Sequence, residues 1–328
     1  MRHGGDLAEA GAAFGVPPQG WLDLSTGVNP YAYPLPPFSS ESLTRLPQKA
    51  ALAALLAAAR RAYGWAEDTP VCAGPGSQAM IQLLPYLRYR KTVVVLGPTY
   101  GEHAYQWARA GHEVREARTL GEIGEPDVVV VVNPNNPTGR IASPKALAKV
   151  AEGLAARDGL LVIDEAFADT NPDVGFGGRL NGRKAIVLRS FGKFFGLPGV
   201  RLGFAAGDEE MVTELAAELG PWPVSGPALE AGAAALSDEA WISSMRLRLS
   251  VEAMRLDDLL GESGFTIIGG TDLFRTARHA RASEVHAALA RAGVWTRRFE
   301  ERPDELRFGL PGDDAAHERF AAALRAAA

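Results

Sequence analysis

Short apolar runs alternate with helix-like stretches along the first two-thirds of the chain. The runs are apolar at consecutive positions, which is typical of strands buried on both faces of a sheet. Runs separated by helices favour a mostly parallel sheet in an α/β domain. The expected strands cover residues 92–96, 127–132, 160–163, 185–188 and 202–205.

Four stretches before and between these runs have the apolar spacing of helices, over residues 48–63, 77–87, 101–110 and 143–157. The last one begins with Ser143 and Pro144, an N-cap residue followed by proline at the first helical position. After about Gly207 the pattern changes to helices rich in Ala, Leu and Arg, followed from Phe265 by a short α+β pattern.

These patterns predict an α/β protein in three parts. The first 40 residues are rich in Pro and Gly and are expected to form an N-terminal arm. Residues 41–208 are expected to form a large domain with a mostly parallel central sheet, and residues 209–328 a smaller C-terminal α+β domain.

Composition narrows the functional classes to which this chain can belong. Hydrophobic residues make up 47% and charged residues 22% of the 328 residues, and the formal net charge is −5. That charge provides no electrostatic footprint for nucleic acid or an anionic membrane. The single cysteine, Cys72, excludes an intrachain disulfide and a Cys-rich metal site. Without a secretory signal or an apolar run of about 20 residues, we expect a cytoplasmic protein that needs no metal.

Polar residues gather where the expected strands end, which is where parallel sheets bind ligands. Taken singly they are weak signals, because Asn-Pro stretches are usually turns and isolated lysines are usually solvated. The Gly-x-Gly-Ser at 74–77 lacks the full dinucleotide fingerprint and follows no obvious strand, which counts against a nicotinamide enzyme. The motifs are Gly74 to Gln78, Asn133 to Gly139, Asp164-Glu165, and Ser190 to Lys193 with Arg201.

Taken in order, these motifs resemble the fold-type I, class I/II aminotransferase family over roughly residues 25 to 310. Within it, the chain is closest to the histidinol-phosphate aminotransferase branch. Three segments look like the threonine-phosphate decarboxylases of that branch: the opening His3 to Asp6, residues 21–30 and residues 306–312. The resemblance implies a fold-type I transferase fold, the cofactor pyridoxal 5′-phosphate (PLP) and a homodimer.

The chemistry of PLP suggests roles for two residues. PLP needs a primary amine for covalent attachment, and Lys193 is the only lysine among these motifs. Phe191, Phe194 and Phe195 would partly desolvate that amine, which favours its neutral form. The pyridine nitrogen needs a buried carboxylate, which we assign to Asp164. Glu165 would point the other way if the segment is extended.

The remaining cofactor residues are assigned by family position and by the donors that a phosphate needs. Asn136 matches the donor to the phenolic oxygen, and Tyr100 the aromatic ring that stacks on the cofactor. A helix start suits a phosphate because its backbone N–H groups point outward. The expected phosphate ligands are Gly76, Ser77, Gln78, Ser190 and Arg201.

Two positions depart from the family pattern. Many relatives have a tyrosine three residues after the aspartate, where this chain has Phe167, which cannot donate a hydrogen bond to the phenolic oxygen. Relatives often have Arg-Tyr-Pro near the start, whereas this chain has Leu46 between Arg45 and Pro47. A hydroxyl that in relatives reaches a neighbouring subunit's cofactor phosphate is therefore missing.

Substrate recognition calls for arginines, because a guanidinium binds a carboxylate with two hydrogen bonds. Arg307 matches the carboxylate-binding arginine of the family. Arg297 matches the arginine that binds the substrate phosphate, although the adjacent Arg298 leaves this choice open by one position. His3 is a further phosphate ligand if the arm folds over the site, and otherwise a tail histidine. Asn29 is expected on the substrate side.

The cofactor motifs do not choose the reaction. We favour decarboxylation of L-threonine O-3-phosphate to (R)-1-aminopropan-2-yl phosphate, a step of cobalamin biosynthesis in the family, with Lys193 reprotonating Cα. A histidinol-phosphate aminotransferase is the alternative, in which Lys193 moves the same kind of proton. A non-catalytic PLP-binding domain is the third hypothesis, and the joint presence of Lys193, Asp164 and Arg201 counts against it.

Overall fold

The computed structural model describes residues 4–327 and divides the chain into two compact units. The central unit comprises Tyr33–Asn136 and Arg140–Ser244. The N/C unit comprises the described residues up to Ala32, then Pro137–Gly139 and the chain from Met245 onward. The boundaries between these units differ from those expected near residues 40 and 208. Two helices after Gly207 belong to the central unit, and the start of the chain belongs to the same unit as its end.

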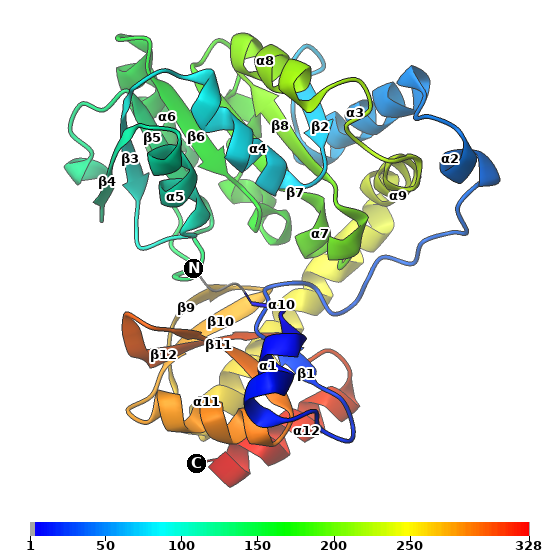
Figure 1. Ribbon diagram of the computed structural model, residues 1–328, viewed down its shortest axis with the longest axis vertical. Helices are drawn as coiled ribbons and strands as arrows, with labels where there is room; N and C mark the ends of the chain where they lie inside the picture. Colours follow the sequence, from blue (N-terminus) through cyan, green and yellow to red (C-terminus); the bar gives the residue numbers. More distant parts are fainter. Residues whose placement is uncertain (1–3, 328) are drawn as a thin grey trace. The chain divides into compact units, whose positions relative to one another are not determined.

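A seven-stranded sheet forms the middle of the central unit, in the order β2-β8-β7-β6-β5-β3-β4 (Figure 1). The five strands from β3 to β7 are parallel, whereas β8 pairs antiparallel with both β7 and β2. The expected mostly parallel sheet is thus confirmed. Its strands are β2 (Val71–Gly74), β3 (Thr92–Leu96), β4 (Glu113–Ala117), β5 (Val128–Val132), β6 (Leu160–Asp164), β7 (Ala185–Ser190) and β8 (Gly203–Gly207).

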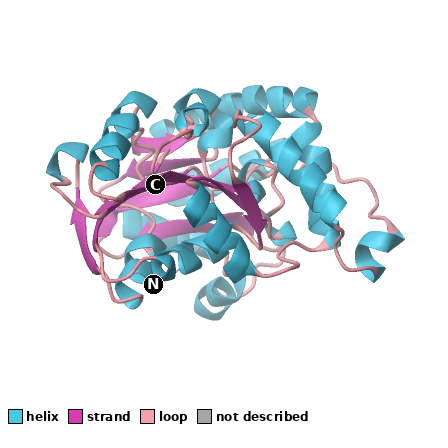
Figure 2. Cartoon of the chain, turned by 90° about the horizontal axis from the view of Figure 1, so that it is seen from above, coloured by secondary structure: helices cyan, strands magenta, loops and turns pink. Residues whose placement is uncertain are grey.

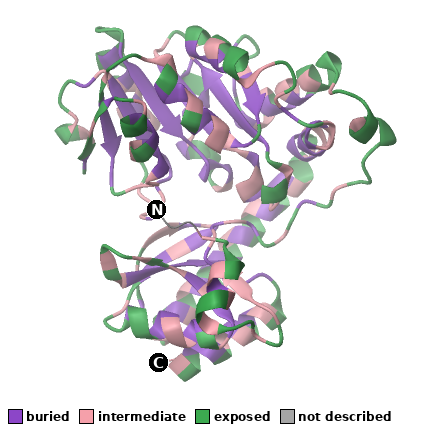
Figure 3. Cartoon of the chain, viewed as in Figure 1, coloured by how far each residue is buried: buried purple, intermediate pink, exposed green. Residues whose placement is uncertain are grey.

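Burial on both faces explains the continuous apolar runs. All five valines of β5 are buried, and alternate residues such as Val128 and Val130 pack with Trp107 and Met80 on one face. Helices lie on both sides of the sheet (Figure 1), and its strands are mostly buried (Figure 3). The helices of this unit are α2 (Ser40–Thr44), α3 (Lys49–Tyr63), α4 (Ser77–Leu83), α5 (Glu102–Arg109), α6 (Pro144–Ala155), α7 (Phe191–Phe194), α8 (Glu209–Leu219) and α9 (Gly226–Ser237).

Two strands of this sheet were not expected from the apolar pattern. Strand β4 lies at the sheet edge, and only one of its five residues is buried. Strand β2 has four residues and directly precedes the Gly-x-Gly-Ser turn, so the expectation that no strand leads into that turn was wrong. Both strands are too short or too polar to give an apolar run.

Six 3₁₀ helices complete the described connections: η1 (Leu84–Leu87), η2 (Leu120–Glu122), η3 (Ala168–Thr170), η4 (Pro172–Val174), η5 (Gly177–Arg179) and η6 (Pro198–Val200).

The N/C unit contains a five-stranded sheet in the order β1-β11-β12-β10-β9. Its strands are β1 (Leu22–Leu24), β9 (Thr266–Thr271), β10 (Phe274–Arg278), β11 (Val294–Phe299) and β12 (Arg302–Gly309). Helices α11 (Ala282–Arg291) and α12 (Asp314–Ala327) pack together, and the long α10 (Glu239–Glu262) runs into this unit from the central one. Figure 2 distinguishes the strands from the helices by colour.

The start of the chain is not a simple arm. Residues Leu7–Phe14 form α1, whose N-cap Asp6 accepts hydrogen bonds from the amides of Ala8 and Glu9. The three residues of β1 pair in parallel with β11, far along the chain. Such a short strand gives no periodicity of its own and is stabilised only by its distant partner. Within residues 4–327, no helix is long and apolar enough to cross a membrane.

Candidate active site

A buried carboxylate lies at the carboxyl end of β6. Asp164 is 3% exposed, and one of its oxygens lies 2.8 Å from Nε2 of His103 on α5. The other oxygen accepts a hydrogen bond from the backbone amide of Ala166. A carboxylate removed from water is stable only with such partners. Asp164 is therefore held in place at this edge of the sheet.

Tyr100 lies just before α5. It contacts Gln78 at the start of α4 on one side and His103, the partner of Asp164, on the other. Its hydroxyl donates to Oε1 of Gln78 at 3.1 Å, and its ring meets the ring of His103 edge to face at 6.2 Å. Burial raises the pKa of Tyr100 to about 12, with Glu102 and Asp164 adding to the rise and Arg201 opposing it. Tyr100 thus stays a neutral, well-anchored ring at neutral pH.

The turn before α4 lies against Arg201 and β8, where small residues make room. A Cβ on Gly76 would lie 2.6 Å from Nη2 of Arg201, and one on Gly203 would lie 2.3 Å from the backbone nitrogen of Ser77. Gly203 also pairs with Ser190 across the β7–β8 ladder. The predicted phosphate ligands Gly76, Ser77, Ser190 and Arg201 are thereby brought together.

Lys193 lies on the short α7, one turn beyond β7. Phe191, Phe194 and Phe195 are all at most 1% exposed and anchor this turn. The Nζ atom of Lys193 lies 5.7 Å from the centre of the Phe167 ring, three residues after Asp164. The lysine therefore follows β7 and the aspartate ends β6, the neighbouring parallel strand. Asn136 lies half-buried after β5, the next strand along, where Asn135 donates to the Pro98 carbonyl.

Glu165 serves a different purpose from Asp164, as its opposite direction predicts. Its carboxylate lies 2.7 Å from Nη2 of Arg189 and accepts from the backbone amide of Phe176. Burial raises the pKa of Glu165, and Arg189 opposes that rise. Both partners are at most 3% exposed, so this pair fastens β6 to β7 beneath the residues described above.

In the N/C unit, the β11–β12 register places two arginines side by side. Arg297 pairs directly with Arg307, whereas Arg298 pairs with Leu306. Directly paired residues point to the same face of a sheet, and successive residues to opposite faces. The Arg298 face is the one that carries His286 of α11, since Nδ1 of His286 lies 2.7 Å from the hydroxyl of Thr296, two residues before Arg298. Of the two candidates left open by the sequence, Arg297 therefore shares a face with Arg307.

Arg307 is held from several sides within its unit. Its Nη2 donates to the Ser25 carbonyl at 2.6 Å, and its guanidinium lies 5.3 Å from the centre of the Phe274 ring. Burial lowers the pKa of Arg307 to about 10; Arg297 contributes to the shift and Asp23 opposes it. The guanidinium remains charged at neutral pH and can bind an anion.

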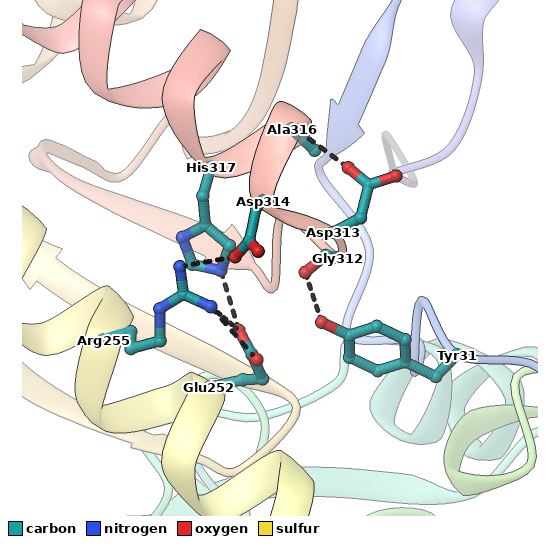
Figure 4. Close-up of polar contacts among 8 residues, drawn as sticks. All are labelled: Tyr31, Glu252, Arg255, Gly312, Asp313, Asp314, Ala316 and His317. Atoms are coloured by element: carbon teal, nitrogen blue, oxygen red, sulfur yellow. Dashed lines mark hydrogen bonds and ion pairs between the residues drawn. The ribbon is translucent and has the colours of Figure 1, made fainter.

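Asn29 and His3 complete the predicted substrate residues. Asn29 is 2% exposed, and its Oδ1 accepts from the backbone amide of Tyr31. The Tyr31 hydroxyl donates in turn to the Gly312 carbonyl after β12 (Figure 4). His3 lies outside the described residues. No group of three or more His, Cys, Asp and Glu side chains able to hold a metal occurs among residues 4–327.

Sequence reasoning missed His103 and Arg189. His103 lies in the first turn of α5, three residues after Tyr100, and the two rings meet edge to face, but a lone histidine is a weak signal. Arg189 directly precedes Ser190 in an otherwise apolar strand, and a charge inside a buried strand demands a buried partner. The charge of Arg189 within an apolar strand was therefore a signal that the sequence already contained.

Comparisons with known proteins agree with this geometry. The model of the family described as "Aminotransferase class I and II" matches residues 42–324. A threonine-phosphate decarboxylase of Pseudomonas aeruginosa is 44% identical over 99% of this chain and 97% of the relative. A histidinol-phosphate aminotransferase of Ruegeria sp. is 30% identical over 77% of this chain and 70% of the relative.

The fold is shared with solved structures as well. A histidinol-phosphate aminotransferase from Sinorhizobium meliloti, solved in complex with pyridoxal-5′-phosphate, superposes with a TM-score of 0.80 at 18% identity. The match covers all of this chain and 96% of that one. On the family model and the near-full-length relative together, the chain belongs to the aminotransferase class I and II family.

Proposed function

We propose that this chain is a PLP-dependent lyase that decarboxylates L-threonine O-3-phosphate to (R)-1-aminopropan-2-yl phosphate, a step of cobalamin biosynthesis. The observation that carries the proposal is the 44% identity to a threonine-phosphate decarboxylase over nearly the full length of both chains, and the direct pairing of Arg297 with Arg307, two cations on one sheet face, fits it. Such a pair suits a substrate with two anions, here a carboxylate and a phosphate. Histidinol phosphate carries only one anionic group.

The residues of the central unit fit PLP, the cofactor of this family. Gly76 has no room for a Cβ beside Arg201, so the turn presents its backbone together with a guanidinium, the donors that a phosphate needs. Asp164 offers a carboxylate that His103 already holds in place. Lys193 supplies the amine from α7, which begins directly where β7 ends.

Each residue would hold a different part of the cofactor. Gly76, Ser77, Gln78, Ser190 and Arg201 would bind the phosphate. Asp164 would keep the ring nitrogen protonated, Tyr100 would cover the ring, and Asn136 would donate to the phenolic oxygen. When bound, PLP withdraws electrons from the substrate Cα and so weakens the bonds to it.

The protein's own groups determine which bond breaks and where the proton goes. Arg307 would orient the carboxylate that leaves as CO₂, and Arg297 would hold the phosphate. Lys193 would then deliver a proton to Cα, replacing the carboxylate. Phe167 contributes an apolar surface beside Nζ of Lys193.

The alternative is a histidinol-phosphate aminotransferase, supported by the relative from Ruegeria sp.. In that reaction, the two arginines would serve a dicarboxylate such as 2-oxoglutarate. The higher identity and fuller coverage of the decarboxylase relative favour the lyase.

One assay separates the two reactions. The PLP-loaded protein would be given L-threonine O-3-phosphate alone and, separately, histidinol phosphate with 2-oxoglutarate. We expect aminopropanol phosphate and CO₂ without any keto acid, identified by mass spectrometry. Glutamate formed only from histidinol phosphate would establish the aminotransferase instead.

We also propose that the enzyme is a cytoplasmic homodimer. Around α2, Phe38, Leu43 and Leu46 are exposed by 38%, 69% and 61%, more apolar surface than one short helix ordinarily leaves in water. A second copy of this chain is the partner that the family resemblance implies. The buried free thiol of Cys72 fits a reducing compartment.

A further inference from the structure

Ser25 joins three parts of the N/C unit that are far apart in sequence. It is fully buried, at 0% exposure. Its hydroxyl donates to Oδ1 of Asp23 at 2.6 Å and accepts from the backbone amide of Gly5 at 2.8 Å. Its carbonyl accepts from Nη2 of Arg307 at 2.6 Å. One residue therefore contacts both the start of the chain and the predicted carboxylate-binding arginine.

The backbone of Ser25 is also held by a contact within its own turn. Its amide donates to the same Asp23 oxygen at 2.8 Å, a local turn of the kind that aspartate favours. The amide of Gly5, the Ser25 hydroxyl and the Asp23 carboxylate form a continuous donor–acceptor chain. Such chains strengthen each bond, since each donor is polarised by the next acceptor.

The start of the chain lies tightly on Ser25. A Cβ on Gly4 would lie 2.5 Å from the Ser25 carbonyl oxygen, which is the atom that also accepts from Arg307. Gly5 has a φ of +88°, a conformation that side chains disfavour. From Gly5 the chain passes to Asp6, the N-cap of α1, so the segment Gly4–Asp6 is tied down at both ends.

The stretch from Ser25 to Tyr31 lies against β12 and the residues that follow it at two further points. Gly309 leaves no room for a Cβ, which would lie 2.2 Å from the Thr26 carbonyl oxygen. Tyr31 donates to the Gly312 carbonyl, beside the polar cluster of Glu252, Arg255 and His317 (Figure 4). Movement of this stretch would therefore be transmitted to β12, and with it to Arg307.

We propose that Ser25 is a positioning residue that couples the N-terminal segment Gly4–Asp6 to the guanidinium of Arg307. Order in the segment fixes the Ser25 carbonyl, and the Ser25 carbonyl fixes the direction of the arginine. Coupling of this kind is reciprocal, so a change at Arg307 alters the segment as well. The consequence for substrate binding rests on the function proposed above, whereas the coupling itself does not.

Amide hydrogen exchange of the N-terminal peptide tests the coupling without substrate. Ser25→Ala removes the acceptor for Gly5, and Arg307→Lys keeps the charge but shortens the reach to the Ser25 carbonyl. We expect both to speed exchange of the Gly5 amide by about threefold to tenfold, the range expected for one lost hydrogen bond. In the double variant, the two effects should not multiply.

Kinetics on the PLP-loaded full chain test the consequence. We expect Ser25→Ala to raise KM for L-threonine O-3-phosphate by about threefold to tenfold, with kcat and the visible cofactor absorbance unchanged. Ser283→Ala is the matched control, because it removes an exposed hydroxyl that donates to the Pro303 carbonyl in the same unit. This control should leave both KM and exchange at their wild-type values.

Two results would overturn the proposal: wild-type exchange in Arg307→Lys, or a wild-type KM in Ser25→Ala. The proposal would also be refuted if the two effects on the exchange rate of the Gly5 amide multiplied in the double variant, because Ser25 and Arg307 would then act separately. If the wild-type protein does not act on threonine phosphate, the function proposed above fails, and the exchange experiment alone decides the coupling.

Discussion

At the scale of single residues, burial gives the ionisable groups of this chain their distinct properties. Asp164 and Glu165 are neighbours in sequence, yet one is held by a histidine and the other by an arginine. Asp164 contacts α5, whereas Glu165 fastens the end of β6 to β7. The surroundings of each carboxylate, and not its place in the sequence, therefore determine its partners.

His286 provides a prediction about pH. Burial, with a smaller contribution from Arg298, lowers its pKa to about 4 from an ordinary value near 6.5, and its Nδ1 lies 2.7 Å from the Thr296 hydroxyl. In the unfolded chain the ring gains a proton as pH falls below 6.5, whereas in the folded chain it stays neutral. The free energy of unfolding should therefore fall by at most about 3 kcal/mol between pH 6.5 and 4.

Chemical denaturation at several pH values measures this effect. His286→Asn should lose that part of the pH dependence, whereas His279→Asn in the same unit should keep it. Equal slopes for His286→Asn and the wild type between pH 6.5 and 4 would refute the assignment.

Lys193 provides the second prediction at this scale. Lys193→Ala removes the amine that would attach the cofactor, so we expect the purified protein to lose its visible absorbance after incubation with PLP. Lys184→Ala is the control, because Lys184 pairs with Asp208 and Glu210 at the other end of β7. A Lys193→Ala protein as yellow as the control would exclude Lys193 as the attachment point.

At the scale of elements, close approach between β8 and the start of α4 shapes the predicted phosphate site. We expect Gly203→Ala to weaken PLP binding at least tenfold, because its Cβ would lie 2.3 Å from the backbone nitrogen of Ser77 and that clash must displace the turn. Gly199→Ala is the control, since a Cβ there meets nothing within 4 Å. Titration with PLP, followed by absorbance, measures both; equal affinities would show that the turn tolerates displacement.

The elements also differ in how well their sequences predict them. Strand β5 is five buried valines, and α6 begins at the expected Ser143 cap, so local signals suffice for both. Strands β2 and β1 have four and three residues, too few for any periodicity. They exist because β8 and β11 supply their hydrogen-bond partners, which no local pattern reveals.

At the scale of the whole molecule, the proposed homodimer leads to a further prediction. Leu43→Glu places a charge in the exposed apolar surface around α2, and burying that charge in an interface would cost several kcal/mol. We expect this variant to sediment as a monomer where the wild type is a dimer. Leu247→Glu, at a position 73% exposed on α10, is the control and should leave the assembly intact. A dimeric Leu43→Glu protein would place the interface elsewhere.

The sequence alone determined the mostly parallel sheet, most helices of the central unit and the order of the motifs that end its strands, because these depend on local apolar spacing and on turn residues. Tertiary structure decided the rest. It joined the described residues up to Ala32 to those from Met245 onward, placed Arg297 and not Arg298 on the sheet face of Arg307 through strand register, and gave Asp164 its histidine. Each of these depends on pairing between residues far apart in the chain, and the energy of such a contact is not contained in either segment by itself.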